Sequence, residues 1–498
     1  MRKSGILLPV SSLAGSYGIG ALSKAAYEWI DYLKEAGQSY WQILPLGPTS
    51  YGDSPYQSFS TFAGNPYFID LNALGEEGLL TEKELNEEKK RFKEDGNRID
   101  YEKVYRTRFQ VLLKAYERWK DRRTEEEMAA FEKFRKESSY WLRDYALYMA
   151  IKNSFGGKCF SEWETVIRLH EAAAISVCLE RYADEVEFYE FQQFVFEKQW
   201  KKLKAYANKN GIEIIGDIPI YVAFDSADTW THPELFQIDD HGNPVAVAGC
   251  PPDAFSETGQ LWGNPLFDWE YHKKTGFEWW LKRLAHCYQL YDVVRIDHFR
   301  GFDEYYSIPY GDKDAVNGTW KPGPGYDLFQ TVREKLGEKK IIAEDLGFLT
   351  DTVIELVKKT GFPGMKILQF AFDSREKSDY LPHNYIKNSV VYTGTHDNDT
   401  LKGWFEVLAP DDKELCVRYL HLEKMTEEEA LWEIIRTAHA SVADTCIIPF
   451  QDYAELGSEA RINTPSTLGN NWVWRMDPVL CTRELAARIR EMTKMYGR

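Results

Sequence analysis

Short, almost continuously apolar segments recur along the chain, and most of them end in a glycine or a polar cluster. A near-continuous apolar run, rather than alternating apolar and polar residues, is expected of a strand buried on both faces in a parallel sheet. We therefore predict strands at residues 40–47, 65–71, 211–222, 291–299, 339–347, 364–372, 389–397 and 445–453.

Helical patterns, with apolar residues on one face, separate several of these strands. They lie at residues 22–37, 276–290, 326–337 and 350–361. Strands that alternate with helices indicate an α/β fold with a parallel sheet, and eight of them point to a (β/α)8 TIM barrel. We predict a single catalytic barrel over residues 1–498, with large helical and loop insertions.

Two kinds of segment interrupt the alternation. Residues from about 76 to 205 are rich in Glu, Lys, Arg and aromatic residues at helical spacing without a lasting heptad, which predicts a helical insertion subdomain. Residues from about 223 to 275 and from 303 to 325 are rich in Gly, Pro, Asp and Trp and are predicted to be loops. Long loops in a compact domain are usually functional, so 223–275 is predicted to be an active-site loop insertion.

The charge, the apolar runs and the cysteines argue against several kinds of partner, location and structural site. With 61 basic and 78 acidic side chains the net charge is −17, which argues against nucleic acid or an anionic membrane as a partner. No apolar run approaches the roughly 18 residues of a membrane-spanning helix, and the run at 6–10 is too short for an export signal, so we expect a cytoplasmic protein. Seven scattered cysteines without a CxxC pair fit reduced thiols better than disulfides or a zinc site.

Carboxylates stand where the predicted strands end. The four are Asp217, Asp297, Glu344 and Asp397. A single aspartate at a strand end is as often a helix cap or a turn residue. Four of them at the carboxyl ends of barrel strands are better explained by an active site, because that face of a barrel carries the catalytic groups.

The neighbours of these carboxylates suggest different tasks. Arg295 and Asp297 are two residues apart on one strand and so share a face, and the guanidinium favours the ionised carboxylate that a nucleophile requires. Glu344 ends an apolar run, and burial would raise its pKa, which suits a general acid. Two carboxyl groups about 5 Å apart form the site of a retaining glycosidase. His396 offers a hydrogen-bond donor for a sugar hydroxyl; the alternative is a structural histidine.

Aromatic residues are abundant, with 16 Trp, 30 Tyr and 27 Phe, and most of them are expected in the core. Tyr51, Tyr56, Trp262 and Trp320 lie instead among Gly, Asp, Asn and Pro. Aromatic faces pack against the C–H groups of sugar rings while polar neighbours bind the hydroxyls, so these residues suit a saccharide groove. The alternative is a set of loops that are each anchored by one buried aromatic ring.

Four motifs resemble the shared regions of the α-amylase clan of glycoside hydrolases. They are GDIPIYV around Asp217, VVRIDHFRG around Asp297, IIAEDLG around Glu344 and TGTHDNDT around Asp397. Longer stretches at 44–71, 247–269 and 461–475 are more specific. From about residue 5 to 475, the chain resembles the 4-α-glucanotransferases, also called amylomaltases or disproportionating enzymes.

This resemblance implies roles for the strand-end carboxylates. Asp297 would be the nucleophile, Glu344 the general acid and base, and Asp397 the group that stabilises the oxocarbenium-like transition state. The residues that would hold the glucosyl unit in subsite −1 are Asp217, Arg295 and His396.

The same resemblance implies a groove for the rest of the glucan. A loop that arches over the groove would carry Asp253, Gln260 and Trp262. The residues lining the groove would be Tyr51, Ser54 and Asn463.

The expected activity is transfer of an α-1,4-glucan segment to the 4-hydroxyl of another glucan or of glucose. The expected partners are malto-oligosaccharides and α-1,4-glucans, without a cofactor or a metal, for a monomer or a homodimer. An α-amylase-type hydrolase would use the same carboxylates, and only the branch-specific loops favour transfer. A non-catalytic glucan-binding protein would have no need of the acid, the nucleophile and the arginine together.

Overall fold

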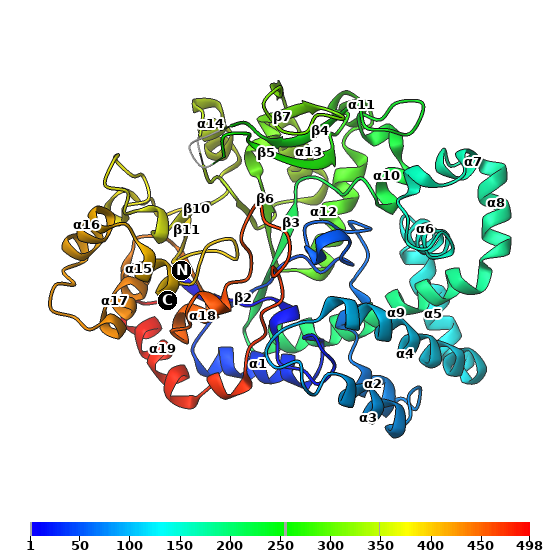
Figure 1. The fold of residues 1–498 in the computed structure, drawn as a ribbon, viewed down its shortest axis with the longest axis horizontal. Coiled ribbons are helices and arrows are strands. Elements are labelled where there is room, and N and C mark those ends of the chain that lie inside the picture. The colour runs from blue at the N-terminus through cyan, green and yellow to red at the C-terminus, as the bar shows by residue number, and fades with distance from the viewer. Residues whose placement is uncertain (1, 253–255, 348) are drawn as a thin grey trace.

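The computed structural model describes residues 2–252, 256–347 and 349–498. At its centre is a barrel of eight parallel strands (Figure 1). The strands are hydrogen-bonded in the order β10-β11-β12-β1-β2-β3-β6-β9. Their bounds are β1 (Lys3–Leu7), β2 (Tyr40–Gln42), β3 (Glu213–Pro219), β6 (Val293–Asp297), β9 (Ile341–Ala343), β10 (Gly364–Ile367), β11 (Ser389–Tyr392) and β12 (Thr445–Pro449). Between β9 and β10 the N–H of Ala343 donates to the carbonyl of Pro363 at 3.0 Å, which nearly closes the ring. The predicted (β/α)8 barrel is confirmed.

One predicted strand is wrong, and one strand was missed. Residues 65–71 form a short 3-10 turn (Pro66–Phe68) and the start of α2 (Leu71–Glu76). The side chains of Asn65 and Asp70 accept hydrogen bonds from main-chain N–H groups two residues ahead, so each ends the extended backbone that a strand needs. The missed strand β1 has the unpromising sequence KSGIL, in which a Cβ on Gly5 would lie 2.4 Å from the Cβ of Tyr40 on β2. The glycine allows this close approach.

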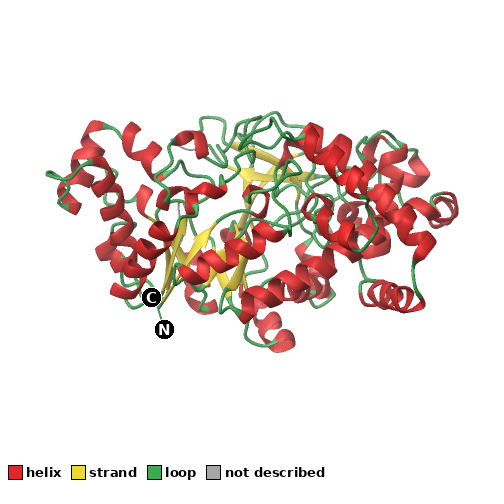
Figure 2. Cartoon of the chain, turned by 90° about the horizontal axis from the view of Figure 1, so that it is seen from below, coloured by secondary structure: helices red, strands yellow, loops and turns green. Residues whose placement is uncertain are grey.

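Helices surround the barrel, and the two ends of the chain lie close together. The four predicted helices are α1 (Lys24–Glu35), α12 (Glu278–Leu290), α13 (Tyr326–Leu336) and α14 (Asp351–Thr360). The later helices are α15 (Leu401–Val407), α16 (Pro410–Leu420), α17 (Glu427–Ala440), α18 (Phe450–Tyr453) and α19 (Arg483–Met495). Both termini lie at the same place in Figures 1 and 2, and the Arg498 guanidinium donates to the carbonyl of Lys3 at 3.2 Å.

A group of helices follows β2 and lies to one side of the barrel (Figure 1). After α2 come α3 (Glu82–Arg91), α4 (Tyr101–Arg122), α5 (Glu125–Glu137), α6 (Leu142–Ser154), α7 (Thr165–Arg168), α8 (Ala172–Arg181) and α9 (Ala183–Lys209). Capping boxes begin α3 and α5, where Thr81 and Thr124 each pair with a glutamate three residues later. Within the described ranges, no helix has the length and apolar character needed to cross a membrane.

A second sheet stands where the sequence predicted loops. It is four-stranded and antiparallel, in the order β5-β4-β7-β8. Its strands are β4 (Ala246–Cys250), β5 (Gln260–Pro265), β7 (Glu304–Pro309) and β8 (Thr319–Pro322), and α10 (Ala227–Thr231) and α11 (Trp269–Lys274) flank the first pair. The central pair, β4 and β7, joins segments on either side of β6, a pairing that no local pattern reveals. Because β7 follows β6 through a 3-10 turn (Phe299–Phe302), the sheet starts at the carboxyl end of a barrel strand.

Candidate active site

The four strand-end carboxylates lie at the same end of the barrel. Asp217 is within β3, Asp297 is the last residue of β6, Glu344 follows β9 directly, and Asp397 lies in the loop after β11. Since the strands are parallel, their carboxyl ends form one rim, and the structure brings these four residues to it.

Arg295 joins two of these carboxylates. Its Nη1 donates to both oxygens of Asp217, at 2.8 and 2.6 Å, and to Oδ1 of Asp297 at 3.0 Å. The register of β3 against β6 sets Asp217 opposite Arg295, while Asp297 shares the face of Arg295 on its own strand. The phenol of Tyr56 donates to Oδ2 of Asp217 at 2.9 Å, so this fully buried carboxylate accepts three hydrogen bonds in all.

Burial and charge act in opposite directions on Asp297. Burial raises the pKa of its carboxyl, and the Arg295 guanidinium lowers it, as expected from the sequence, but the effect of burial is the larger. The side chain of Asp297 keeps 31% of its surface exposed, whereas Asp217 is fully buried. Asp297 is therefore the most exposed member of this ion-paired group.

Glu344 is held by main-chain donors. Its Oε2 accepts from the N–H of His298 at 2.6 Å and its Oε1 from the N–H of Leu346 at 2.9 Å. Burial raises the pKa of Glu344, and the neighbouring charge of Asp297 raises it further. Of the two carboxyl groups, Glu344 is the one suited to carry a proton, because Arg295 bonds directly to Asp297.

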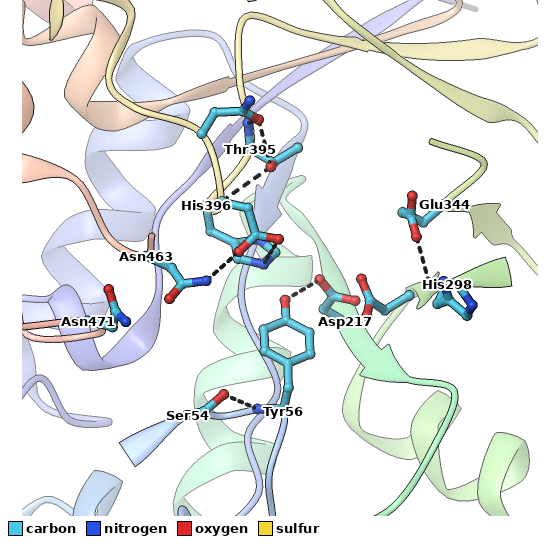
Figure 3. Close-up of polar contacts among 12 residues, drawn as sticks. Ser54, Tyr56, Asp217, His298, Glu344, Thr395, His396, Asn463 and Asn471 are labelled. Carbon is cyan, nitrogen blue, oxygen red and sulfur yellow. Dashed lines mark hydrogen bonds and ion pairs between the residues drawn. The ribbon is translucent and has the colours of Figure 1, made fainter. Parts of the chain in front are cut away.

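Asp397 forms a second group with His396 and Asn463. In Figure 3, His396 and Asn463 lie on one side of Tyr56 and Asp217, and Glu344 lies on the other. Nδ2 of Asn463 donates to Oδ1 of Asp397 at 2.6 Å, and Nε2 of His396 lies 3.4 Å from Oδ2. The ring of His396 stacks on that of Tyr56, with centroids 5.1 Å apart and planes at 18°. Tyr56 thus links this group to Asp217.

The predicted arch over the groove is placed in part. Gln260 and Trp262 lie on β5, where Oε1 of Gln260 accepts from Nε1 of Trp262 at 3.1 Å. The half-buried ring of Trp262 meets the ring of His298 edge to face at 4.8 Å, next to the donor that holds Glu344. Asp253 lies outside the described residues, so the structure does not place it.

The remaining predicted residues differ in what they contact. Oγ of Ser54 accepts a hydrogen bond of 3.2 Å from the N–H of Tyr56. Tyr51 begins a 3-10 turn (Tyr51–Asp53), and its side chain lies outside the described part of the structure. Trp320, predicted with the sugar-facing aromatics, is on β8, and the Arg300 guanidinium lies 4.1 Å above its ring.

Two residues are closer to the site than sequence reasoning indicated. Tyr56 was expected among the aromatics of a saccharide groove but not in contact with Asp217 or His396, and its signal was its position among Gly, Asp and Ser in the motif SYGDSPY. His298 was not singled out; it has a left-handed backbone (φ 53°), and nothing in its sequence announces the hydrogen bond to Glu344. Among the described residues, no group of three or more His, Cys, Asp or Glu side chains is arranged to hold a metal ion.

Comparisons with known proteins identify the family of this chain. Residues 8–481 match the family model described as 4-alpha-glucanotransferase. A 4-alpha-glucanotransferase of Clostridium butyricum is 51% identical over 98% of this chain and 99% of its own length, and one of Streptococcus pneumoniae is 49% identical over 100% and 97%. The structure of an amylomaltase from Streptococcus agalactiae in complex with acarbose covers 100% of both chains with a TM-score of 0.96 and 41% identity. The chain belongs to the 4-alpha-glucanotransferase family.

Proposed function

We propose that the protein transfers a segment of an α-1,4-glucan to the 4-hydroxyl of another glucan or of glucose, by a retaining double displacement through a covalent glucosyl ester of Asp297. One observation carries this proposal. Arg295 binds Asp297 and Asp217 together, while the N–H of the residue after Asp297 holds Glu344. A nucleophile and an acid are thereby held in fixed relation to one another.

In the first displacement Asp297 attacks the anomeric carbon of the donor glucan. The bond from that carbon to the glycosidic oxygen breaks, and Glu344 gives its proton to the departing oxygen. Positive charge develops on the sugar ring in the transition state, and the Asp397 carboxylate stabilises it. The product is a β-linked ester on Asp297 and a shortened glucan with a free 4-hydroxyl.

In the second displacement the 4-hydroxyl of an acceptor attacks the same carbon. Glu344, now ionised, takes the proton of that hydroxyl, and the ester bond to Asp297 breaks. Two inversions restore the α configuration. Transfer requires that an acceptor occupies the site in preference to water, so the residues that cover the groove decide the outcome.

The binding residues are proposed from the family resemblance, and their contacts support the proposal. Asp217, Arg295 and His396 are proposed to hold the glucosyl unit at subsite −1, and Tyr56 fits this task because it bonds to Asp217 and stacks on His396. The residues proposed to cover and line the rest of the groove are Tyr51, Ser54, Asp253, Gln260, Trp262 and Asn463.

Incubation of the purified protein with maltotriose tests the proposal. A ladder of longer and shorter oligosaccharides, with free glucose and a constant number of reducing ends, is the expected result, because every cleavage is matched by a new bond. Rising reducing ends would show hydrolysis and contradict the transferase assignment. An unchanged maltotriose pool would contradict enzymatic activity on α-1,4-glucans.

A further inference from the structure

Arg461 links the main chain of two site residues. Its Nε donates to the carbonyl of Asn463 at 2.8 Å, and its Nη2 donates to the carbonyl of Asp397 at 2.8 Å. The side chains of these same two residues are hydrogen-bonded at 2.6 Å. The guanidinium and the amide–carboxylate bond therefore tie Asn463 to Asp397 at two separate points.

A further contact extends this link to His396. The N–H of Asn463 donates to the carbonyl of His396 at 3.1 Å, so the segment from Arg461 to Asn463 runs along the loop that carries His396 and Asp397. The loop lies between the end of β11 and the start of α15 and has hydrogen bonds of its own, from the N–H of Asp397 to Oγ1 of Thr395 at 3.3 Å and from the N–H of Thr395 to Oδ1 of Asn398 at 2.8 Å. Arg461 adds a cationic support from outside the loop.

The carboxylate that pairs with Arg461 is that of Asp399, not that of Asp397. Nη1 of Arg461 lies 3.9 Å from Oδ2 of Asp399, and the same Oδ2 accepts from Oγ of Ser458 at 2.7 Å. Arg461 meets Asp397 only through its main-chain carbonyl, whereas Arg295 binds the carboxylate of Asp297 directly. The Asp397 side chain keeps 43% of its surface exposed, so its negative charge stays available to a positively charged sugar ring.

We propose that Arg461 is a positioning residue for the transfer reaction, which fixes the Asp397 carboxylate through the main chain without neutralising it. The inference rests on the proposed function, in which Asp397 stabilises the transition state. A planar guanidinium presents several N–H groups in a fixed fork, so it can reach two carbonyls at once, and a lysine ammonium cannot reproduce that geometry. A misplacement of about 1 Å in a catalytic group costs on the order of 100-fold in rate.

The first experiment compares Arg461→Lys and Arg461→Ala with the wild type on maltotriose. We expect kcat to fall on the order of 100-fold in Arg461→Ala, with little change in KM, because Asp397 acts on the transition state more than on the bound substrate. Guanidinium ion at millimolar concentration should restore part of the kcat of Arg461→Ala. Arg475→Ala is the control, since Arg475 is a buried arginine that also donates to a main-chain carbonyl, but to that of Gly15 instead. It should lower the melting temperature without a change in kcat that guanidinium ion restores.

The second experiment asks whether Arg461 acts through Asp397. In an Asp397→Ala background, Arg461→Ala should produce little further loss of kcat, since the group it positions is already gone. Full additivity of the two losses would overturn the inference, and so would an Arg461→Ala enzyme with wild-type kcat. If Arg461→Ala does not fold, Arg461→Lys decides: wild-type kcat in that variant would contradict the need for the fork. A wild-type protein that leaves maltotriose unchanged would refute the proposed function instead.

Discussion

The main-chain N–H of His298 donates a hydrogen bond of 2.6 Å to Oε2 of Glu344. His298 directly follows Asp297, so the bond couples the position of the proposed acid to the strand that ends in the proposed nucleophile. Rotation of the His298 side chain cannot break this link, because the donor belongs to the backbone. The hydrogen bond thereby connects two residues that are far apart in the sequence. In the proposed mechanism one acts on the anomeric carbon and the other on the oxygen of the same glycosidic bond.

Asp297→Asn should lower turnover of maltotriose by at least ~10³-fold, because an amide cannot form the glucosyl ester. The fold should survive, since Arg295 keeps both hydrogen bonds to Asp217 and is not left as an unpaired buried cation. Turnover, glucan affinity and melting temperature measured side by side test this. Asp351→Asn, at an exposed position at the start of α14, is the control and should change none of them. A variant with wild-type turnover would remove Asp297 from the role of nucleophile.

The rate of the first displacement should depend on pH through Glu344. Burial and the charge of Asp297 raise the pKa of Glu344 to about 7. Because the protonated acid is lost as the pH rises through this pKa, cleavage of maltotriose should fall on the alkaline side. With α-maltosyl fluoride as donor the leaving group needs no proton, and the release of fluoride should no longer fall there.

Glu344→Gln provides the corresponding mutant. It should lose far more activity on maltotriose than in fluoride release from α-maltosyl fluoride. An alkaline fall that is the same for both donors would show that some other group titrates.

Trp262→Ala should raise KM for maltotriose on the order of tenfold, equivalent to ~1.4 kcal/mol, and increase hydrolysis relative to transfer. The half-buried indole lies against His298, beside Glu344, so its removal opens the site to water. Trp320→Ala is the control, because Trp320 is on β8, at the opposite edge of the same small sheet, with Arg300 against its ring. Equal effects of the two substitutions would separate Trp262 from the groove.

Asp452 should make stability depend on pH. Burial raises the pKa of this carboxyl to about 7, although it accepts hydrogen bonds from the Thr393 hydroxyl at 2.5 Å and the Leu401 N–H at 2.8 Å. In the unfolded chain the pKa of an aspartate is ~3.9. Between that pH and about pH 7, the folded state therefore keeps a proton on Asp452 that the unfolded state has lost. The stabilisation is therefore complete below about pH 4 and is lost as the pH rises through about 7.

Asp452→Asn should remove that dependence. Between pH 4 and pH 8 the melting temperature of the wild type should fall relative to the variant, on the order of a few °C. Asp240→Asn, at an exposed turn, should behave as the wild type does. Parallel melting curves for wild type and Asp452→Asn would show that Asp452 remains ionised.

The local sequence was sufficient for most of the barrel and for the carboxylates of the site. Apolar runs that end in Asp217 and Asp297 indicate buried strands with a charge at the end, and parallel pairing then sets both at one rim. The strand predicted at 65–71 was wrong because the side chains of Asn65 and Asp70 cap a 3-10 turn and a helix that contain these apolar residues. These caps compete with strand formation without changing the hydrophobic pattern.

Only the tertiary structure decided which groups meet. The hydrogen bond from His298 to Glu344, the bridge of Arg461 and the pairing of β4 with β7 join segments that are distant in the chain. The predicted contribution of Arg295 to Asp297 was right in sign, but its balance against burial depends on how much water the surrounding chain excludes. Periodicity along a sequence specifies which face a side chain occupies. Distances between such faces, and the desolvation of the charges on them, arise only when the whole chain packs.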